Sequence, residues 1–170
     1  MYTDYFLKSD TVINHIKHIN LPPENYLLRQ SYIGFVCIVA VATYEMAIKD
    51  ILVNFCTKHN PLFGNFFSSK FHRINGNIEI DKIKSNFLIH FGDNYKETFE
   101  DMIDFENDML LQKEHKSLKE TYKNIITWRN LFAHSASFNT TILTTLDEVC
   151  NSYNIGKNVI TCLDIILNEI

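Results

Sequence analysis

Residues 32–44, YIGFVCIVAVATY, contain no charged side chain. A helix that spans a membrane needs about 20 apolar residues, so this run is too short to be one. It is instead typical of a central helix that is buried on all sides. The helical pattern extends outward over residues 24–60, from Pro22 and Pro23 to the residue before Pro61, which predicts one long helix.

The chain of 170 residues is long enough for one hydrophobic core, and we expect a single domain over residues 1–170. Hydrophobic residues make up 46% and aromatic residues 13%, which argues against intrinsic disorder. The formal net charge of −4 gives no overall attraction to nucleic acid or to an anionic membrane, so any phosphate binding must be local.

The cysteines and the N-terminus indicate a cytoplasmic protein without a cofactor or metal. Cys37, Cys56, Cys150 and Cys162 have no regular spacing, so we predict buried thiols in a reducing compartment. The first ten residues, MYTDYFLKSD, lack the apolar core of a signal peptide. We expect no membrane association.

Helical spacing continues through most of the chain and predicts an all-α bundle. Residues 10–19 form a short amphipathic pattern with Asp10 or Thr11 as a candidate N-cap. We expect a turn or short helix over 61–71, a loop over 72–79, two helices on either side of Gly92 within 81–107, and helices over 114–134 and 145–170. Thr145 and Glu148 have the spacing of a capping box. The stretches NIEI and TTILTT are too short to build a sheet.

The helix predicted over residues 114–134 ends in a polar cluster, WRNLFAHS. Its apolar residues share one stripe within about 40°: Leu118, Tyr122, Ile125 and Phe132. Arg129 lies on the same stripe, where a cation is costly unless it is paired or borders a cleft or an interface. Asn130 and His134 are four residues apart and share a neighbouring face.

Arg, Asn and His together suit metal-independent cleavage of RNA. The 2′-hydroxyl must lose a proton, the leaving 5′-oxygen must gain one, and negative charge builds on the phosphorus between them. Histidine can act as acid or base near neutral pH, and arginine offers a planar fork to phosphate oxygens. The alternative is an ordinary solvated helix end, because a lone helical histidine is usually structural and the spacing alone is a weak signal.

The segment RNLFAH resembles the motif of the HEPN superfamily, in which an arginine, a polar residue and a histidine lie near a helix end. Ala133 matches the small residue before the histidine, and TTLDEV opens the next helix as in relatives. The stretch IVAVATYEMAIKDIL, residues 38–52, is similar to the long helix of the RiboL-PSP branch. The resemblance covers roughly residues 25–169.

The resemblance implies a helical domain with one long central helix, a motif helix and a C-terminal helix. It also implies a homodimer whose two motifs face each other across a cleft, and many members are endoribonucleases of defence or toxin systems. Arg129 and His134 would be the catalytic pair, Asn130 a supporting polar residue, and Glu45 the family's acidic position, able to hold Arg129 by a salt bridge. A helical pair of Glu45 with Lys49 is the structural alternative.

Two departures from the pattern follow the motif. Ala136 stands where one group, which pairs with a nucleotidyltransferase antitoxin, has a tyrosine, and this disfavours that pairing. Ser135 replaces a common glycine.

Other candidate sites are weaker. His15 and His18 lack a third ligand at metal-binding spacing. Lys70, His72 and Arg73 lie in FFSSKFHR, which could stack on and attract single-stranded RNA, although its phenylalanines are more typical of a core.

The sequence leaves two functions open. The first is an endoribonuclease that acts as a toxin or abortive-infection effector, with an antitoxin or defence protein as partner. The second is a non-catalytic module that binds RNA or another protein, which the acidic composition favours.

Overall fold

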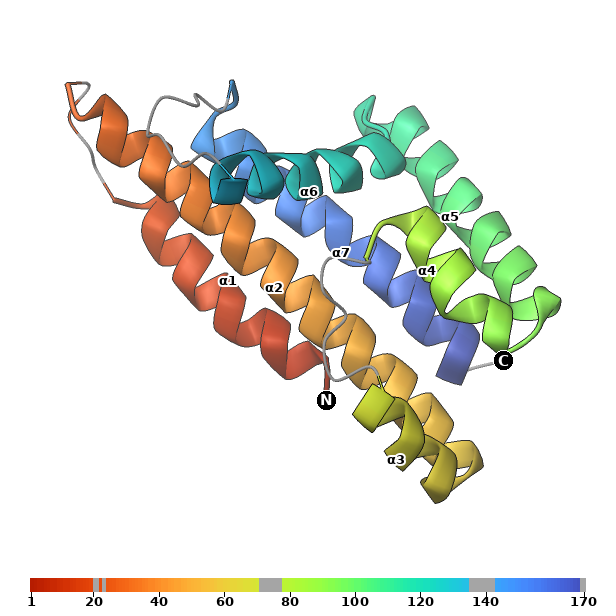
Figure 1. Cartoon of the computed structure of the whole chain (residues 1–170). Helices are drawn as coiled ribbons and strands as arrows, with labels where there is room; N and C mark the ends of the chain where they lie inside the picture. Colours follow the sequence, from red (N-terminus) through yellow and green to blue (C-terminus); the bar gives the residue numbers. More distant parts are fainter. Residues whose placement is uncertain (20–21, 23, 71–77, 135–142, 169–170) are drawn as a thin grey trace.

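The computed structural model describes residues 1–19, 22, 24–70, 78–134 and 143–168. Every regular element in these ranges is helical, which confirms the all-α prediction (Figure 1). The elements are α1 (Thr3–Lys17), α2 (Tyr26–His59), α3 (Pro61–Lys70), α4 (Ile80–Asn86), the 3-10 helix η1 (Leu88–His90), α5 (Asp93–Glu114), α6 (Leu118–His134) and α7 (Leu146–Asn168).

The long helix α2 is the centre of the bundle, and α1, α3, α6 and α7 pack against it (Figure 1). Val36, Cys37, Ala40 and Tyr44 are fully buried there. The prediction that residues 32–44 are buried on all sides is wrong for one face.

That exposed face carries Phe35, Ile38 and Met46, which are 46%, 37% and 49% exposed. Their spacing of three and eight residues places them on one side of α2, together with the exposed Ala42. We call these four residues the α2 apolar stripe. The other sides of α2 are covered by its neighbouring helices, whereas no described element covers this one.

The helix α1 begins at Thr3, seven residues before the predicted start, so neither Asp10 nor Thr11 is its N-cap. Lys157 Nζ of α7 donates to Asp10 Oδ1 over 2.6 Å, and Thr11 Oγ1 donates to the carbonyl oxygen of Leu7 over 3.0 Å. The N-terminal segment is therefore a full helix that is tied to α7.

Other local predictions are confirmed. Gly92 has a φ of 119° and separates η1 from α5. The backbone N–H of Glu148 donates to Thr145 Oγ1 over 3.1 Å, so Thr145 caps α7. All four cysteines are buried and free. Most of the predicted loop over residues 72–79 lies outside the described residues.

Three stacked tyrosines join α2, α6 and α7 at the middle of the core. The ring centroid of Tyr44 lies 5.3 Å from that of Tyr122 and 5.8 Å from that of Tyr153. Tyr44 Oη donates to the carbonyl oxygen of Tyr153 over 2.5 Å. Gly156 makes room for this group, because a Cβ there would lie 2.4 Å from Tyr44 Oη.

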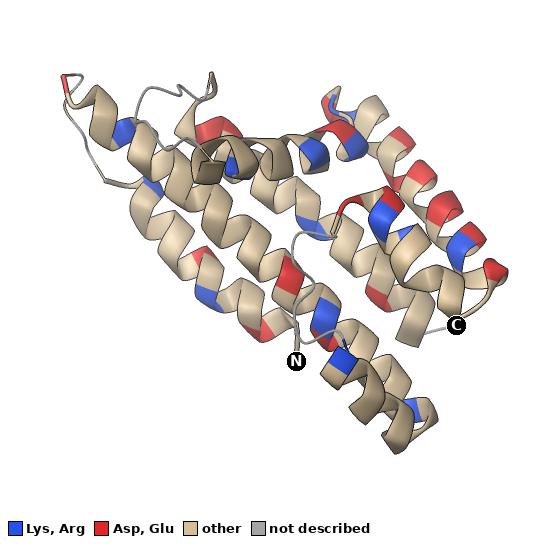
Figure 2. Ribbon diagram, in the orientation of Figure 1, with Lys and Arg blue, Asp and Glu red and all other residues tan. Residues whose placement is uncertain are grey.

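Charged side chains are unevenly distributed, and carboxylates line the outer surface of α5 (Figure 2). None of the described helices combines the length and the apolar character needed to cross a membrane.

Candidate active site

The helix α6 carries the polar cluster, and its apolar stripe fixes the helix on the core. Leu118, Tyr122 and Ile125 are buried. Near the C-terminal end of α6, the ring of Phe132 packs over Gly34 of α2, so closely that a Cβ on Gly34 would lie 2.1 Å from the ring. This glycine lets the end of α6 approach α2. Sequence reasoning missed the contact, and its only signal is a small residue within a run of bulky ones.

Arg129 reaches across from α6 to α2. Its Nη2 atom lies 3.7 Å from Oε1 of Glu45, and its Nη1 atom donates to Oδ1 of Asn130 over 2.9 Å. The side chains of Arg129 and Glu45 are 30% and 23% exposed, so the pair lies at the edge of the core. The predicted salt bridge is confirmed, and it explains how a cation is accommodated on an apolar stripe.

His134 is the last residue of α6, and its side chain is exposed. The guanidinium of Arg129 turns toward Glu45 and Asn130, and within the described ranges no hydrogen bond joins it to His134. The arginine is therefore held in place by its neighbours, while the imidazole is accessible to solvent. Ser135 and Ala136 lie outside the described residues.

Tyr122 is buried on α6, about two turns before Arg129. Its hydroxyl donates to the carbonyl oxygen of Ile78 over 2.8 Å. Burial raises the pKa of Tyr122 well above its ordinary value, and the negative charges of Glu45 and Glu79 raise that pKa further. The phenol therefore stays protonated at any physiological pH.

The structure adds little support for the weaker candidate sites. In the described part of the chain, His15 and His18 belong to no group of three or more metal-ligating side chains. Lys70 Nζ lies 5.6 Å from the ring centroid of Phe66, which is 58% exposed. His72 and Arg73 lie outside the described residues, so the RNA-stacking interpretation of this segment stays a prediction.

Comparison with known families gives a match over nearly the whole chain. The model of the family described as RiboL-PSP-HEPN matches residues 4–169. The match includes α1, which the resemblance in the sequence did not cover. No curated protein and no solved structure matches the chain.

Proposed function

We propose that this chain, which belongs to the RiboL-PSP-HEPN family, is a metal-independent endoribonuclease that cuts RNA with Arg129, Asn130 and His134. Family membership supports an RNA-related function of the ribonuclease type. The observation that carries the finer proposal is the position of Arg129. A carboxylate of another helix and a neighbouring amide fix its guanidinium at the protein surface, five residues before an exposed histidine at the end of the same helix.

The proposed reaction is transfer of the phosphoryl group to the adjacent 2′-oxygen. An imidazole of His134 takes the proton of the 2′-hydroxyl, and the 2′-oxygen forms a bond to phosphorus. The bond from phosphorus to the 5′-oxygen breaks, and that oxygen takes a proton from an imidazolium. Arg129 stabilises the charge on the non-bridging oxygens, and Asn130 orients the guanidinium. The products carry a 2′,3′-cyclic phosphate and a 5′-hydroxyl.

A homodimer would bring two such motifs together, so that one His134 acts as base and the other as acid. The α2 apolar stripe supports this arrangement, because Phe35, Ile38 and Met46 are exposed beside Glu45 on the same helix. Contiguous exposed apolar residues mark interaction surfaces. Burying them against a second copy would place both Arg129–Glu45 pairs near the interface.

The biological role we propose is that of a cytoplasmic toxin or abortive-infection effector, restrained by an antitoxin or defence partner. Its support is the resemblance to HEPN proteins of that kind. If this role is right, expression of the wild-type chain slows growth, and expression of His134→Ala does not. Equal growth with both proteins at equal abundance argues against it.

The deciding experiment incubates wild type, His134→Ala and Arg129→Ala with total cellular RNA in EDTA and identifies the new ends. His90→Ala is the matched control, because His90 is another exposed histidine far along the chain from the motif. We expect wild type and His90→Ala to leave 2′,3′-cyclic phosphate ends and both motif variants to leave RNA intact. Cleavage that survives His134→Ala would refute the assignment of the site.

The second candidate function is a non-catalytic module that binds RNA or a protein. The carboxylates on α5 and the net charge of −4 favour it, because a free ribonuclease usually offers the RNA backbone a positive track. Intact RNA with wild-type protein, together with binding that depends on Arg129, would select this alternative.

A further inference from the structure

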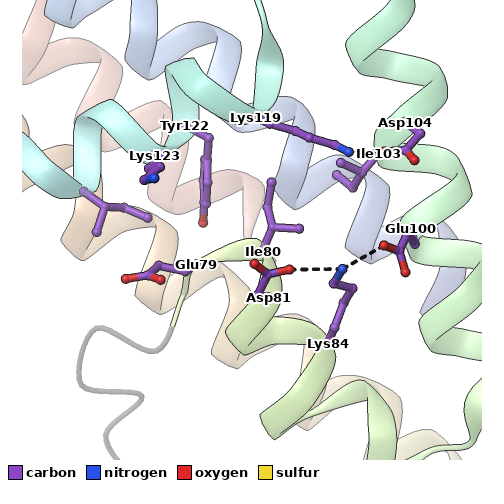
Figure 3. Close-up of a pocket in the computed structure, with 11 residues that line it drawn as sticks. Glu79, Ile80, Asp81, Lys84, Glu100, Ile103, Asp104, Lys119, Tyr122 and Lys123 are labelled. Carbon is purple, nitrogen blue, oxygen red and sulfur yellow. Dashed lines mark hydrogen bonds and ion pairs between the residues drawn. The ribbon is translucent and has the colours of Figure 1, made fainter.

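A pocket of about 360 Å³ opens between α4, α5 and α6, outside the candidate active site. Such a volume lies at the lower end of the range for small-molecule sites. Ile80, Ile103 and Ile126 supply apolar surface. Charged side chains lie around Ile80 and Ile103 (Figure 3). Four carboxylates and three lysines line the pocket.

Most of these charges are neutralised by one another. Lys84 Nζ lies 3.1 Å from Asp81 Oδ1 and 3.0 Å from Glu100 Oε1, and Lys119 pairs with Asp104. Partial burial lowers the pKa of Lys84, but its hydrogen bonds to the two carboxylates outweigh that effect and raise the pKa overall. Lys84 is therefore held as a structural cation at one end of the pocket.

Two opposite charges are left, Glu79 and Lys123. In the ranges that the structure describes, neither side chain has an ion-pair partner. Both lie near Tyr122 (Figure 3). The pocket thus offers a ligand the carboxylate of Glu79 as a hydrogen-bond acceptor and the ammonium of Lys123 as a donor, next to the apolar surface of the isoleucines.

The pocket lies along the same face of α6 as Asn130 and His134. Lys123, Ile126, Asn130 and His134 lie within about 80° of one another around the helix axis. Lys123 is about 10 Å from Asn130 and about 16 Å from His134 along that axis. Tyr122 lines the pocket, and the negative charges of both Glu45 and Glu79 raise its pKa.

We propose that this pocket binds a base of the RNA substrate a few nucleotides from the cut, and that it selects guanine. The proposal rests on the proposed function, because it supplies the substrate recognition of the same site. A surplus of carboxylates disfavours a phosphate in the pocket, whereas a neutral base avoids that repulsion. An unstacked base is commonly recognised through its hydrogen-bonding edges.

Guanine matches the two available charges. Its N1–H and its amino group both donate to the carboxylate of Glu79, and its carbonyl oxygen accepts from the ammonium of Lys123. Adenine and cytosine offer the carboxylate a single amino group, and uracil offers it a single N–H, so each of them loses one of the two hydrogen bonds to Glu79. The base ring would lie on Ile80 and Ile126.

The test measures binding and cleavage separately. The four nucleoside 5′-monophosphates are titrated into isotope-labelled His134→Ala protein, and amide shifts of α4 and α6 are followed by NMR. We expect GMP to bind about tenfold more tightly than AMP, CMP and UMP, with the largest shifts at the pocket. Glu79→Gln should remove most of this difference. Glu97→Gln is the matched control, because Glu97 is an exposed carboxylate on α5 that does not line the pocket.

Cleavage sites of wild type, Glu79→Gln and Lys123→Gln are then mapped on mixed RNA, with Lys8→Gln on α1 as the control for a lost lysine. A base preference near the cut that Glu79→Gln and Lys123→Gln weaken, and that both controls retain, supports the pocket. Cleavage with the same preference in all proteins overturns the pocket and leaves the ribonuclease standing. Selective nucleotide binding without cleavage supports the pocket and removes the proposed catalysis. Equal or absent binding of all four nucleotides overturns the pocket.

Discussion

The ion pair between Arg129 and Glu45 is expected to stabilise the fold as well as hold the proposed catalytic arginine. The perturbation is a double-mutant cycle with Glu45→Gln, Arg129→Met and the combined variant. Each substitution removes one charge and keeps much of the side-chain volume. The cycle therefore isolates the energy of the pair from the separate cost of each substitution.

The expected coupling follows from the distance and the exposure of the pair. Two unit charges about 4 Å apart attract by about 4 kcal/mol at an effective dielectric constant of 20. Removing both groups from water offsets much of that energy. Fully exposed pairs are worth only about 0.2–1 kcal/mol. Because Arg129 and Glu45 are 30% and 23% exposed, we expect a coupling of about 1–2 kcal/mol.

Urea unfolding of the four proteins at low salt measures the coupling, and RNA cleavage is followed in parallel. The control cycle uses Lys17 and Asp147, a pair 3.4 Å apart whose side chains are 44% and 80% exposed, where we expect less than about 0.5 kcal/mol. Glu45→Gln should also slow cleavage, because the guanidinium loses its anchor. A coupling no larger than in the control cycle would refute the view that Glu45 fixes Arg129.

Three further variants probe the scaffold, the buried thiols and the apolar stripe. Gly34→Ala would place a Cβ 2.1 Å from the ring of Phe132, so we expect a loss of about 1–3 kcal/mol in urea unfolding and slower cleavage as the end of α6 shifts. Burial raises the pKa of Cys37 from 9.0 to about 12, so the unfolded chain loses the thiol proton at a lower pH than the folded protein does. The free energy of unfolding is therefore unaffected by this thiol below pH 9 and falls as the pH rises toward 12. That loss is about 1.4 kcal/mol at pH 10, and Cys37→Ala should lessen the drop in unfolding free energy between pH 8 and pH 10 by this amount. Phe35→Glu should shift sedimentation from dimer to monomer and reduce cleavage, whereas Leu62→Glu, at an exposed leucine of α3, should do neither; an unchanged dimer would remove the α2 apolar stripe from the proposed interface.

The elements that local sequence patterns predict well are the long ones. The interval between prolines predicted α2 to within two residues at its N-terminal end and one at its C-terminal end, and the capping pattern of Thr145 located the start of α7. These features depend on spacing and on hydrogen bonds within one segment. The contact of Arg129 with Glu45 was predicted for a different reason, because a cation on an apolar stripe requires a partner and the family resemblance pointed to an acidic residue on α2.

Other features that depend on contacts between distant segments were not predicted. The early start of α1 is stabilised in part by the pair of Asp10 with Lys157, which lie 147 positions apart. The exposed side of α2 has the same apolar composition as its buried sides, so only the packing of the neighbouring helices distinguishes them. The pocket draws its lining from α4, α5 and α6, and its two available charges, Glu79 and Lys123, are unremarkable in the sequence.

The distribution of charge constrains how RNA would reach the proposed site. The net charge is −4, and the carboxylates of α5 repel a phosphate backbone that approaches from their side (Figure 2). Arg129 is already paired with Glu45, and Lys119 is paired with Asp104, which leaves Lys123 as the nearest unpaired cation on the described part of α6. Few phosphates can therefore be neutralised, and attraction to the backbone contributes little to affinity. Under the proposed function, recognition of a base in the pocket has to supply the affinity that contacts with the phosphate backbone do not. Glu79, although a carboxylate, would then favour binding of the correct RNA while its charge disfavours nonspecific binding of others.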